Sequence, residues 1–196
     1  MSVTLYFAPF TRATRPRWLL EELGVAYDLV VVDKADDGHF GDAAFRAGVH
    51  PLGKLPALSI DGVTMFESAA IIALLADRHL DKGLAPALDA TERAPYLQWL
   101  FYAMTTVEPA VVSAAGHKDD AEALAKSKAR FAEAVAPVAR LLATQDWLLT
   151  TGFSAADVVM GAVLIWAASI KLVDDTALLA YVERCKARPL WKKTLR

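Results

Sequence analysis

The sequence predicts an α/β protein of two domains, in which a small mixed sheet with helices precedes a domain made only of helices. Short β-rich runs alternate with helical patterns up to about residue 79, an irregular stretch with glycine and proline follows, and helical periodicity alone continues to the end. We therefore expect a first domain at residues 1–79, a linker at 80–90 and an all-helical domain at 91–196.

Composition excludes several classes of function. The chain has 196 residues and a formal net charge of −2, without a run of Lys and Arg, so we expect no nucleic-acid partner. A lone cysteine, Cys185, excludes an internal disulfide framework and fits a reducing compartment. The N-terminus does not resemble a signal peptide, and the most apolar stretch, 158–168, is shorter than the roughly 20 residues that a membrane span needs. The sequence predicts a cytoplasmic protein without a membrane partner.

The first three elements are a strand, a helix and a strand. Val3–Phe7 and Tyr27–Val32 are apolar and β-rich, and Arg15–Gly24 lies between them. Four apolar residues of this middle segment share one helical face, and Gly24 is placed to end the helix. This face consists of Trp18, Leu19, Leu20 and Leu23. A strand–helix–strand unit predicts two parallel strands with a right-handed crossover.

A hairpin and a helix complete the first domain. After a possible short helix at Asp42–Ala47, strands are predicted at Ala57–Ile60 and Val63–Phe66. The intervening Asp61-Gly62 dipeptide favours a type I′ turn. A helix follows from Ser68 to about His79, so the order is βαβ(α)ββα, with both parallel and antiparallel neighbours in the sheet.

Two prolines and one buried helix mark the second domain. Apolar residues recur at helical spacing through 97–111 and 124–142. Glu108-Pro109 predicts a bend in the first of these helices, and Pro137 a kink in the second. The apolar stretch 158–168 predicts a helix that is buried on nearly all sides.

Three segments carry a resemblance to a known family. HPLGKLPAL (50–58), followed by the Asp-Gly hairpin and FES (66–68), resembles the glutathione transferase superfamily. RPRWLLEELGVAYD (15–28) is similar to the first helix of bacterial members. FSAAD (153–157) resembles the capping box, formed here by Ser154 and Asp157, that opens a core helix of their second domain. The resemblance covers nearly the whole chain and implies a thioredoxin-like domain (βαβαββα) followed by an all-α domain.

The resemblance implies a glutathione site. Leu55-Pro56 looks like the family's cis-proline dipeptide, which would present the N–H and C=O of Leu55 to the backbone of the glutathione cysteine, although a trans proline that starts a strand is the alternative. Ser68 and its helix N-terminus would take the γ-glutamyl carboxylate and Glu67 the ammonium, with plain capping as the alternative. The resulting set is His50, Lys54, Leu55, Pro56, Glu67 and Ser68.

His50 and Lys54 lie beside the proline loop, where they would meet the glycyl carboxylate of glutathione. Solvated loop charges are the equal alternative for these two. The four histidines of the chain lie far apart and show no metal-ligand spacing, so we expect no metal.

The catalytic task is to hold the glutathione sulfur as a thiolate. Lowering a thiol pKa of about 8.5 by two units requires about 2.7 kcal/mol. A hydrogen bond to a charged acceptor contributes about 1.5–3 kcal/mol, and a helix N-terminus about 0.3–1 kcal/mol, so one hydroxyl at the start of the first helix is sufficient.

Thr11 is the first candidate for this hydroxyl. By resemblance it falls where serine-type members carry their activating serine, while Tyr6 falls at the position of the tyrosine-type members. Arg12 occupies the position that cysteine-type members use, which argues against mixed-disulfide chemistry, and it would give electrostatic support. The alternatives are a turn role for Thr11 and a core role for Tyr6.

The second substrate is expected to be an apolar electrophile, held between the loop after the first strand and the first long helix of the second domain. Core packing is the alternative for Trp166. The candidate set is Phe10, Tyr102, Thr105, Thr106 and Trp166.

The resemblance therefore implies a glutathione transferase that adds the thiolate to a hydrophobic electrophile. The alternatives are another glutathione-dependent activity, such as isomerisation or peroxide reduction, and a non-catalytic regulatory or scaffold protein on the same fold. The resemblance also implies that the protein is a homodimer.

Overall fold

The computed structural model describes residues 2–195, which form two compact units. The first unit comprises residues 2–82 together with 189–195, and the second comprises Gly83–Arg188. The sequence places residues 189–195 with the helical domain, whereas in the structure they belong to the first unit.

The first unit is built on a four-stranded sheet with the strand order β2–β1–β3–β4. β1 is parallel to β2 and antiparallel to β3, and β3 is antiparallel to β4. The strands are β1 (Val3–Phe7), β2 (Asp28–Val31), β3 (Ala57–Ile60) and β4 (Val63–Phe66). The predicted mixed sheet is confirmed, and the hairpin turn has positive φ at both Asp61 (49°) and Gly62 (83°), as a type I′ turn requires.

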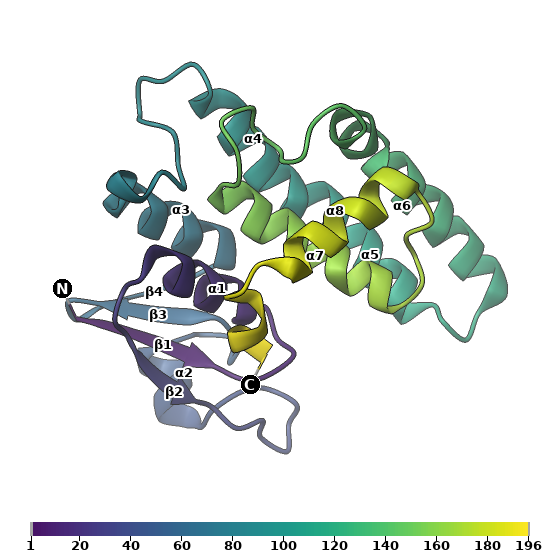
Figure 1. Cartoon of the computed structure of the whole chain (residues 1–196). Coiled ribbons are helices and arrows are strands. Elements are labelled where there is room, and N and C mark those ends of the chain that lie inside the picture. The colour runs from purple at the N-terminus through teal and green to yellow at the C-terminus, as the bar shows by residue number, and fades with distance from the viewer. Residues whose placement is uncertain (1, 196) are drawn as a thin grey trace. The chain divides into compact units, whose positions relative to one another are not determined.

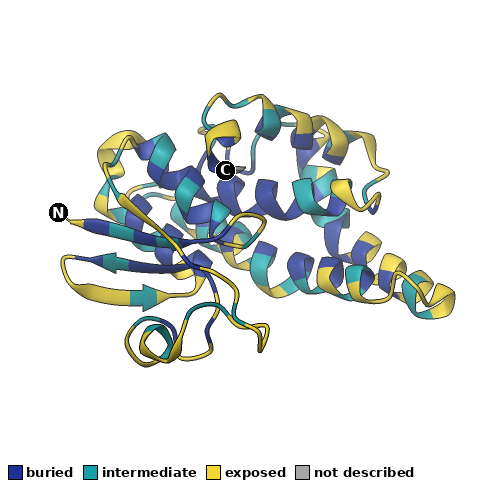
Figure 2. Cartoon of the chain, turned by 90° about the horizontal axis from the view of Figure 1, so that it is seen from below, coloured by how far each residue is buried: buried dark blue, intermediate teal, exposed yellow. Residues whose placement is uncertain are grey.

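Helices cover both faces of this sheet. Figure 1 shows α1 (Thr14–Leu23) and α3 (Ser68–Arg78) on one face and α2 (Ala43–Gly48) on the other. β1 alternates accordingly: Val3, Leu5 and Phe7 are buried and the residues between them are half-buried, a pattern visible on the strand that starts at the N label in Figure 2. This alternation directs every second side chain of β1 toward α1 and α3.

The C-terminal segment packs on α1. The rings of Trp191 and Trp18 meet edge to face with their centroids 4.8 Å apart, and both side chains are buried. Lys193 Nζ also lies 3.8 Å from a carboxylate oxygen of Glu21, which is on α1. These contacts account for the assignment of residues 189–195 to the first unit.

The second unit is all helical. Its helices are α4 (Arg93–Tyr102), α5 (Glu108–Gly116), α6 (Ala121–Leu142), α7 (Ala155–Ser169) and α8 (Thr176–Ala187). α7 packs against α4, α5 and α8 and is buried along most of its length, as the sequence predicts. Among residues 2–195, no helix has the length and apolar character needed to cross a bilayer.

A π-helical turn at Ala103–Val107 joins α4 to α5. Pro109 follows this turn. Because a proline has no N–H, Pro109 cannot donate a hydrogen bond to the Thr105 carbonyl four residues earlier, and its ring crowds that carbonyl. A wider turn relieves this clash, so the irregularity predicted at Glu108-Pro109 takes the form of a π turn. By contrast, α6 continues through Pro137 without interruption.

The predicted capping box of α7 is confirmed: the Ser154 side chain accepts from the backbone at Asp157, and the Asp157 side chain accepts from the Ser154 backbone. The Asp157 carboxylate is fully buried and accepts four hydrogen bonds, from Leu148 N (2.9 Å), Ser154 N (2.9 Å), Ser154 Oγ (3.0 Å) and Tyr181 Oη (3.0 Å). Burial raises the pKa of Asp157, and the four donors act against that shift.

Cys185 is expected to resist alkylation in the folded protein. Its side chain is 0% exposed on α8, and burial raises the pKa of the thiol far above its ordinary value. Iodoacetamide at pH 8, followed by intact-mass measurement, should therefore leave the native chain unmodified and label it once in urea. Labelling at equal rates in both conditions would contradict this packing.

Candidate functional site

Three segments that are distant in sequence meet at one end of the sheet. Tyr6 is paired with Ala57, and Ala57 with Phe66, across three adjacent strands. β1 and β4 end at this level and β3 begins there, so the loop after β1, the Leu55-Pro56 dipeptide and the start of α3 all extend from the same edge. We call residues 8–13, 50–56 and 66–68 the site edge.

The Leu55–Pro56 peptide bond is cis, as the sequence predicts. Neither the N–H nor the C=O of Leu55 forms a hydrogen bond with any residue in the described range 2–195. Leu55 lies two residues before the first residue of β3, Ala57, where an extended peptide could continue the antiparallel pattern. The geometry offers one donor and one acceptor for a peptide backbone.

The start of α3 is strained. Glu67, at the N-cap position, has φ 76° and ψ 107°, a conformation that only glycine adopts readily. Its exposed side chain makes no capping hydrogen bond, so capping does not explain the acidic residue here. Ser68 is buried at the first helical position, and the positive end of a helix dipole favours an anion there.

His50 is buried at the same edge. Its Nδ1 accepts a hydrogen bond from Leu52 N (3.2 Å), and its ring lies against Phe66 with centroids 4.7 Å apart. Burial lowers the pKa of His50, the Glu67 carboxylate raises it and the Lys54 ammonium lowers it, so these three groups share one electrostatic neighbourhood.

Lys54 is exposed and forms no ion pair with any described residue. With His50 neutral, the Lys54 ammonium is the cation that this loop offers to a carboxylate.

Thr11 has a structural role in the loop before α1. Its Oγ1 donates to the Ala8 carbonyl (2.7 Å) and accepts from Ala13 N (3.3 Å). A hydroxyl has one proton, so Thr11 can donate to a ligand only by releasing Ala8.

The other candidates near Thr11 differ in position. Phe10 is 92% exposed and has φ 59°, and Arg12 is exposed beside it. Tyr6 lies within β1 on the sheet face that carries α2, where its ring meets Phe45 edge to face at 5.7 Å. The structure thus places Thr11, Phe10 and Arg12 in one loop and packs Tyr6 away from it.

Of the electrophile candidates of the second unit, Tyr102, Thr105 and Thr106 lie in or next to the π turn, and Trp166 lies on α7. The Tyr102 hydroxyl donates to the Ala134 carbonyl (2.9 Å), and Thr105 Oγ1 donates to the Phe101 carbonyl (3.0 Å). Thr106 and Trp166 are half-buried. No group of three His, Cys, Asp or Glu side chains suited to a metal is found within residues 2–195.

A supporting loop was missed in the sequence. Phe40 N donates to the Gly53 carbonyl (2.7 Å), and a His39 ring nitrogen lies 3.0 Å from the Leu52 carbonyl oxygen. A Cβ on Gly53 would lie 2.9 Å from the Phe40 carbonyl, so glycine permits this close approach. The glycine of HPLG, Gly53, is the only feature of the sequence that points to a close backbone approach at this position. It does not identify residues 39–40 as the segment that packs there.

Comparison with known families gives two matches. Residues 10–78 match the family described as "Glutathione S-transferase, N-terminal domain", and residues 121–184 match "Glutathione S-transferase, C-terminal domain". Together the two matches span more than half of the chain, one in each compact unit.

Individual proteins show the same similarity. Glutathione S-transferase GstA of Escherichia coli O157:H7 is 27% identical over 94% of this chain and 93% of its own. Disulfide-bond oxidoreductase YfcG of E. coli K12 is 34% identical over 55% of this chain. The chain spans about half the length of the curated relatives at 34% identity.

A solved structure resembles the whole chain. A sphingomonad glutathione S-transferase complexed with glutathione superimposes with a TM-score of 0.85 at 29% identity, covering 98% of this chain and 96% of its own.

Proposed function

Because the chain belongs to the glutathione S-transferase superfamily, we propose that its site edge binds glutathione, holds the sulfur as a thiolate and adds it to a hydrophobic electrophile. One observation carries the proposal: the unpaired backbone groups of Leu55 and the N-terminus of α3 extend from the same end of the sheet as the Thr11 loop. A peptide with an acidic terminus and a thiol matches this arrangement of groups.

Each part of the tripeptide has a complementary group. Its cysteinyl backbone would pair with Leu55 beside Pro56, its γ-glutamyl carboxylate would meet Ser68 and the first N–H groups of α3, and its ammonium would meet Glu67. The glycyl carboxylate would meet Lys54, with His50 beside it. Glu67 and Lys54 have no ion-pair partner among the described residues, which leaves both charges available.

Thr11 remains the first candidate for the thiolate donor, with Arg12 as electrostatic support and Tyr6 second. The Thr11 hydroxyl must exchange its bond to the Ala8 carbonyl for one to sulfur. A hydrogen bond to a charged group contributes about 1.5–3 kcal/mol and a neutral one about 0.5–1.5, so the exchange favours the thiolate by about 1–1.5 kcal/mol. This corresponds to about one unit in the thiol pKa, with the α1 N-terminus supplying the rest.

Thr11→Val is expected to raise the pKa of enzyme-bound glutathione by about one unit and to lower kcat about tenfold at neutral pH, while glutathione affinity changes little. Thiolate absorbance in the ultraviolet across pH measures the pKa directly. Thr11→Ser keeps the hydroxyl and should stay near the wild-type values, which separates donation from the turn role.

If Thr11→Val leaves both the thiol pKa and kcat unchanged, Thr11 is not the donor. Loss of activity in Tyr6→Phe would then move the assignment to Tyr6.

Disulfide reduction is the second candidate function, favoured by the similarity to the oxidoreductase YfcG. In this reaction two glutathione thiols are oxidised to one disulfide while the substrate disulfide is reduced to two thiols. Cys185 is buried, so both reducing sulfurs would come from glutathione. Parallel assays with 1-chloro-2,4-dinitrobenzene and bis(2-hydroxyethyl) disulfide separate the two functions, because a transferase is faster with the first substrate and a reductase with the second.

Several finer expectations remain predictions. They are the electrophile-binding role of Phe10, Tyr102, Thr105, Thr106 and Trp166, the homodimer, and the cytoplasmic location. Isomerisation, peroxide reduction and a non-catalytic role are alternatives that the same pair of assays, extended to those substrates, would reveal.

A further inference from the structure

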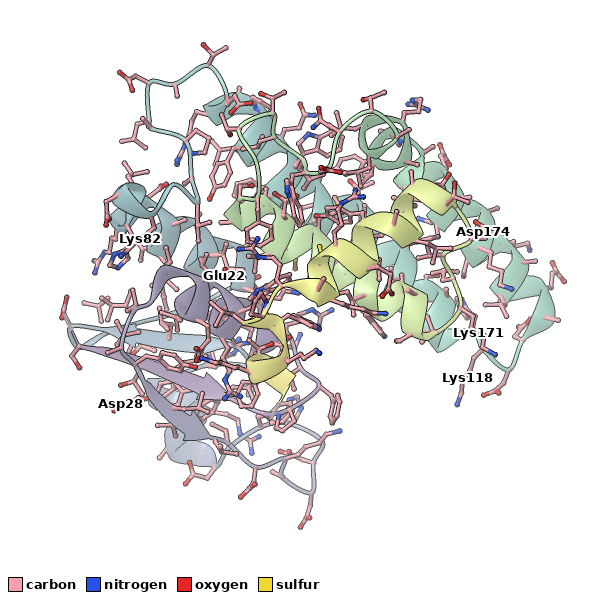
Figure 3. The ribbon with its side chains drawn as sticks, in the orientation of Figure 1. Glu22, Asp28, Lys82, Lys118, Lys171 and Asp174 are labelled. Atoms are coloured by element: carbon pink, nitrogen blue, oxygen red, sulfur yellow. The ribbon has the colours of Figure 1, made fainter. Side chains whose placement is uncertain are left out.

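His50 differs from most titratable side chains of the chain because it is buried. Asp28, Lys82 and Lys118, which Figure 3 labels, are by contrast exposed and extend away from the ribbon. All four histidines lie within the described residues 2–195, and His50 is the buried one among them, with 5% of its surface exposed. A solvated charge beside the ligand would not require burial, so the ring needs another explanation.

The hydrogen bond of the ring identifies the nitrogen that carries the proton. Leu52 N donates to His50 Nδ1 at 3.2 Å, so Nδ1 is an acceptor and the neutral imidazole carries its proton on Nε2. His50 thus accepts from the backbone N–H two residues later, as an Asn or Asp side chain does in an Asx turn. The His50 carbonyl also accepts from Gly53 N (2.9 Å), so ring and backbone stabilise the same turn.

This turn leads directly into the groups that are proposed to hold glutathione. Lys54 and Leu55 follow Gly53 in the chain. The start of the turn is fixed to the end of α2, because His50 N donates to the Phe45 carbonyl (3.1 Å). The His50 ring therefore lies between a backbone that α2 holds and the residues that would face the ligand.

Protonation of His50 is incompatible with this turn. The second proton would go on Nδ1, where it would face the Leu52 N–H without an acceptor between them. Two charged groups act on the ring: the Glu67 carboxylate at the start of α3, which raises the pKa of His50, and the Lys54 ammonium on its own loop, which lowers it. Burial is the largest influence and lowers the pKa, so the fold favours the neutral ring.

The other neighbouring elements offer no second group with this property. On α2, Arg46 is paired with Asp37 at 2.6 Å, and the contact from β4 is an uncharged phenyl ring. In the 39–40 segment, a His39 ring nitrogen lies 3.0 Å from the Leu52 carbonyl oxygen and bears a proton whether His39 is neutral or charged. Protonation of His39 therefore keeps its bond to the loop, whereas protonation of His50 breaks one.

We propose that His50 is a positioning residue whose neutral imidazole accepts from Leu52 N and thereby holds residues 53–56 in the arrangement that binds glutathione. Protonation of the ring releases this turn and weakens binding. The sign follows from the lowered pKa of His50: affinity is constant above the ordinary histidine pKa of about 6.5 and declines as the pH falls below it toward the lowered value. The proposal rests on the proposed glutathione site and makes that site sensitive to mild acid.

S-Methylglutathione tests the proposal by calorimetry on the full chain at pH 7.5 and pH 5.5. This thioether has no thiol to titrate, and its carboxylates and ammonium keep their charges over this range. A buried N–H without an acceptor costs a factor of about five or more, so the wild-type Kd should be about fivefold weaker at pH 5.5. A change of less than twofold would overturn the proposal.

Substitutions at His50 separate the acceptor from the titration. In His50→Asn the side-chain carbonyl can accept from Leu52 N but does not titrate, so the Kd should change less than twofold between the two pH values. His50→Ala has no acceptor, so its binding should be equally independent of pH and about fivefold weaker than that of His50→Asn at pH 7.5. Equal affinity of these two variants, or the wild-type pH dependence in His50→Asn, would overturn the proposal.

His39→Asn is the matched control, because it keeps a donor for the Leu52 carbonyl and removes the other titrating ring at this loop. It should keep the wild-type ratio of the two Kd values. Loss of the pH dependence in this variant would assign the effect to His39.

The amide ¹H–¹⁵N signal of Leu52 reports the bond without ligand. It should titrate between pH 7.5 and pH 5.5 in the wild type and stay unchanged in His50→Asn. A signal that does not titrate in the wild type would contradict the role of His50. Absence of S-methylglutathione binding at both pH values, with the Leu52 titration intact, would instead contradict the proposed function.

Discussion

Glu67→Gly is expected to make the protein more stable and a poorer binder of glutathione. A non-glycine residue at φ 76° destabilises the folded state by about 1–3 kcal/mol, and Glu67→Gly removes this strain. Glycine also has greater freedom in the unfolded chain, which offsets about 0.5–1 kcal/mol of the gain. The free energy of unfolding of the variant should therefore be about 1 kcal/mol higher. Loss of a carboxylate paired with the ligand ammonium costs about 1.5–3 kcal/mol, which weakens the Kd about tenfold to a hundredfold.

Urea unfolding and glutathione calorimetry on the same variant measure the two effects separately. Asp61→Gly is the matched control, because Asp61 is the other acidic residue of this unit with positive φ, and its carboxylate accepts from Ser2 N. It should leave glutathione affinity within twofold. A Glu67→Gly protein that binds glutathione as tightly as wild type would remove Glu67 from the site.

Asp157→Ala is expected to lower the free energy of unfolding by about 3–5 kcal/mol. The substitution leaves the backbone N–H groups of Leu148 and Ser154 buried without an acceptor, and each such group costs about 1–3 kcal/mol. The Tyr181 hydroxyl keeps only the long contact to the carbonyl of residue 157 (3.5 Å). A loss of this size is a large part of the stability of an ordinary domain, so a fraction of the chain should be unfolded already at moderate urea.

Asp120→Ala is the comparison variant for this effect. Asp120 also caps a helix, accepting from Ala123 N (3.0 Å), but it is exposed, so its loss should cost only about 1 kcal/mol. Urea titration followed by tryptophan fluorescence compares the two variants. Equal destabilisation by both would show that burial of the Asp157 network contributes nothing beyond helix capping.

Local signals predicted the elements that local chemistry determines. The strands of the Asp61-Gly62 hairpin have the predicted bounds, because a two-residue type I′ turn leaves the flanking register no freedom. The end of α1 at Gly24 and the capping box of α7 follow from backbone conformation and donor counts within a few residues.

Long-range contacts were not predictable in this way. The docking of Trp191 on Trp18 joins residues at opposite ends of the chain, and neither neighbourhood signals it.

The candidate site shows the same division. The cis bond at Pro56 was predicted from HPLGKLPAL, whereas the direction of the Thr11 hydroxyl depends on the Ala8 carbonyl, whose position follows from the folded loop. The contribution of the 39–40 segment likewise depends on a close approach to Gly53 that sequence spacing does not reveal.

A crystal structure of the protein with glutathione tests the central claim most directly. We expect the cysteinyl N–H and C=O of the tripeptide to pair with the C=O and N–H of Leu55, its γ-glutamyl carboxylate to lie at Ser68, and its sulfur to lie at the Thr11 loop. A tripeptide bound away from this edge, with the Leu55 groups still unpaired, would contradict the account.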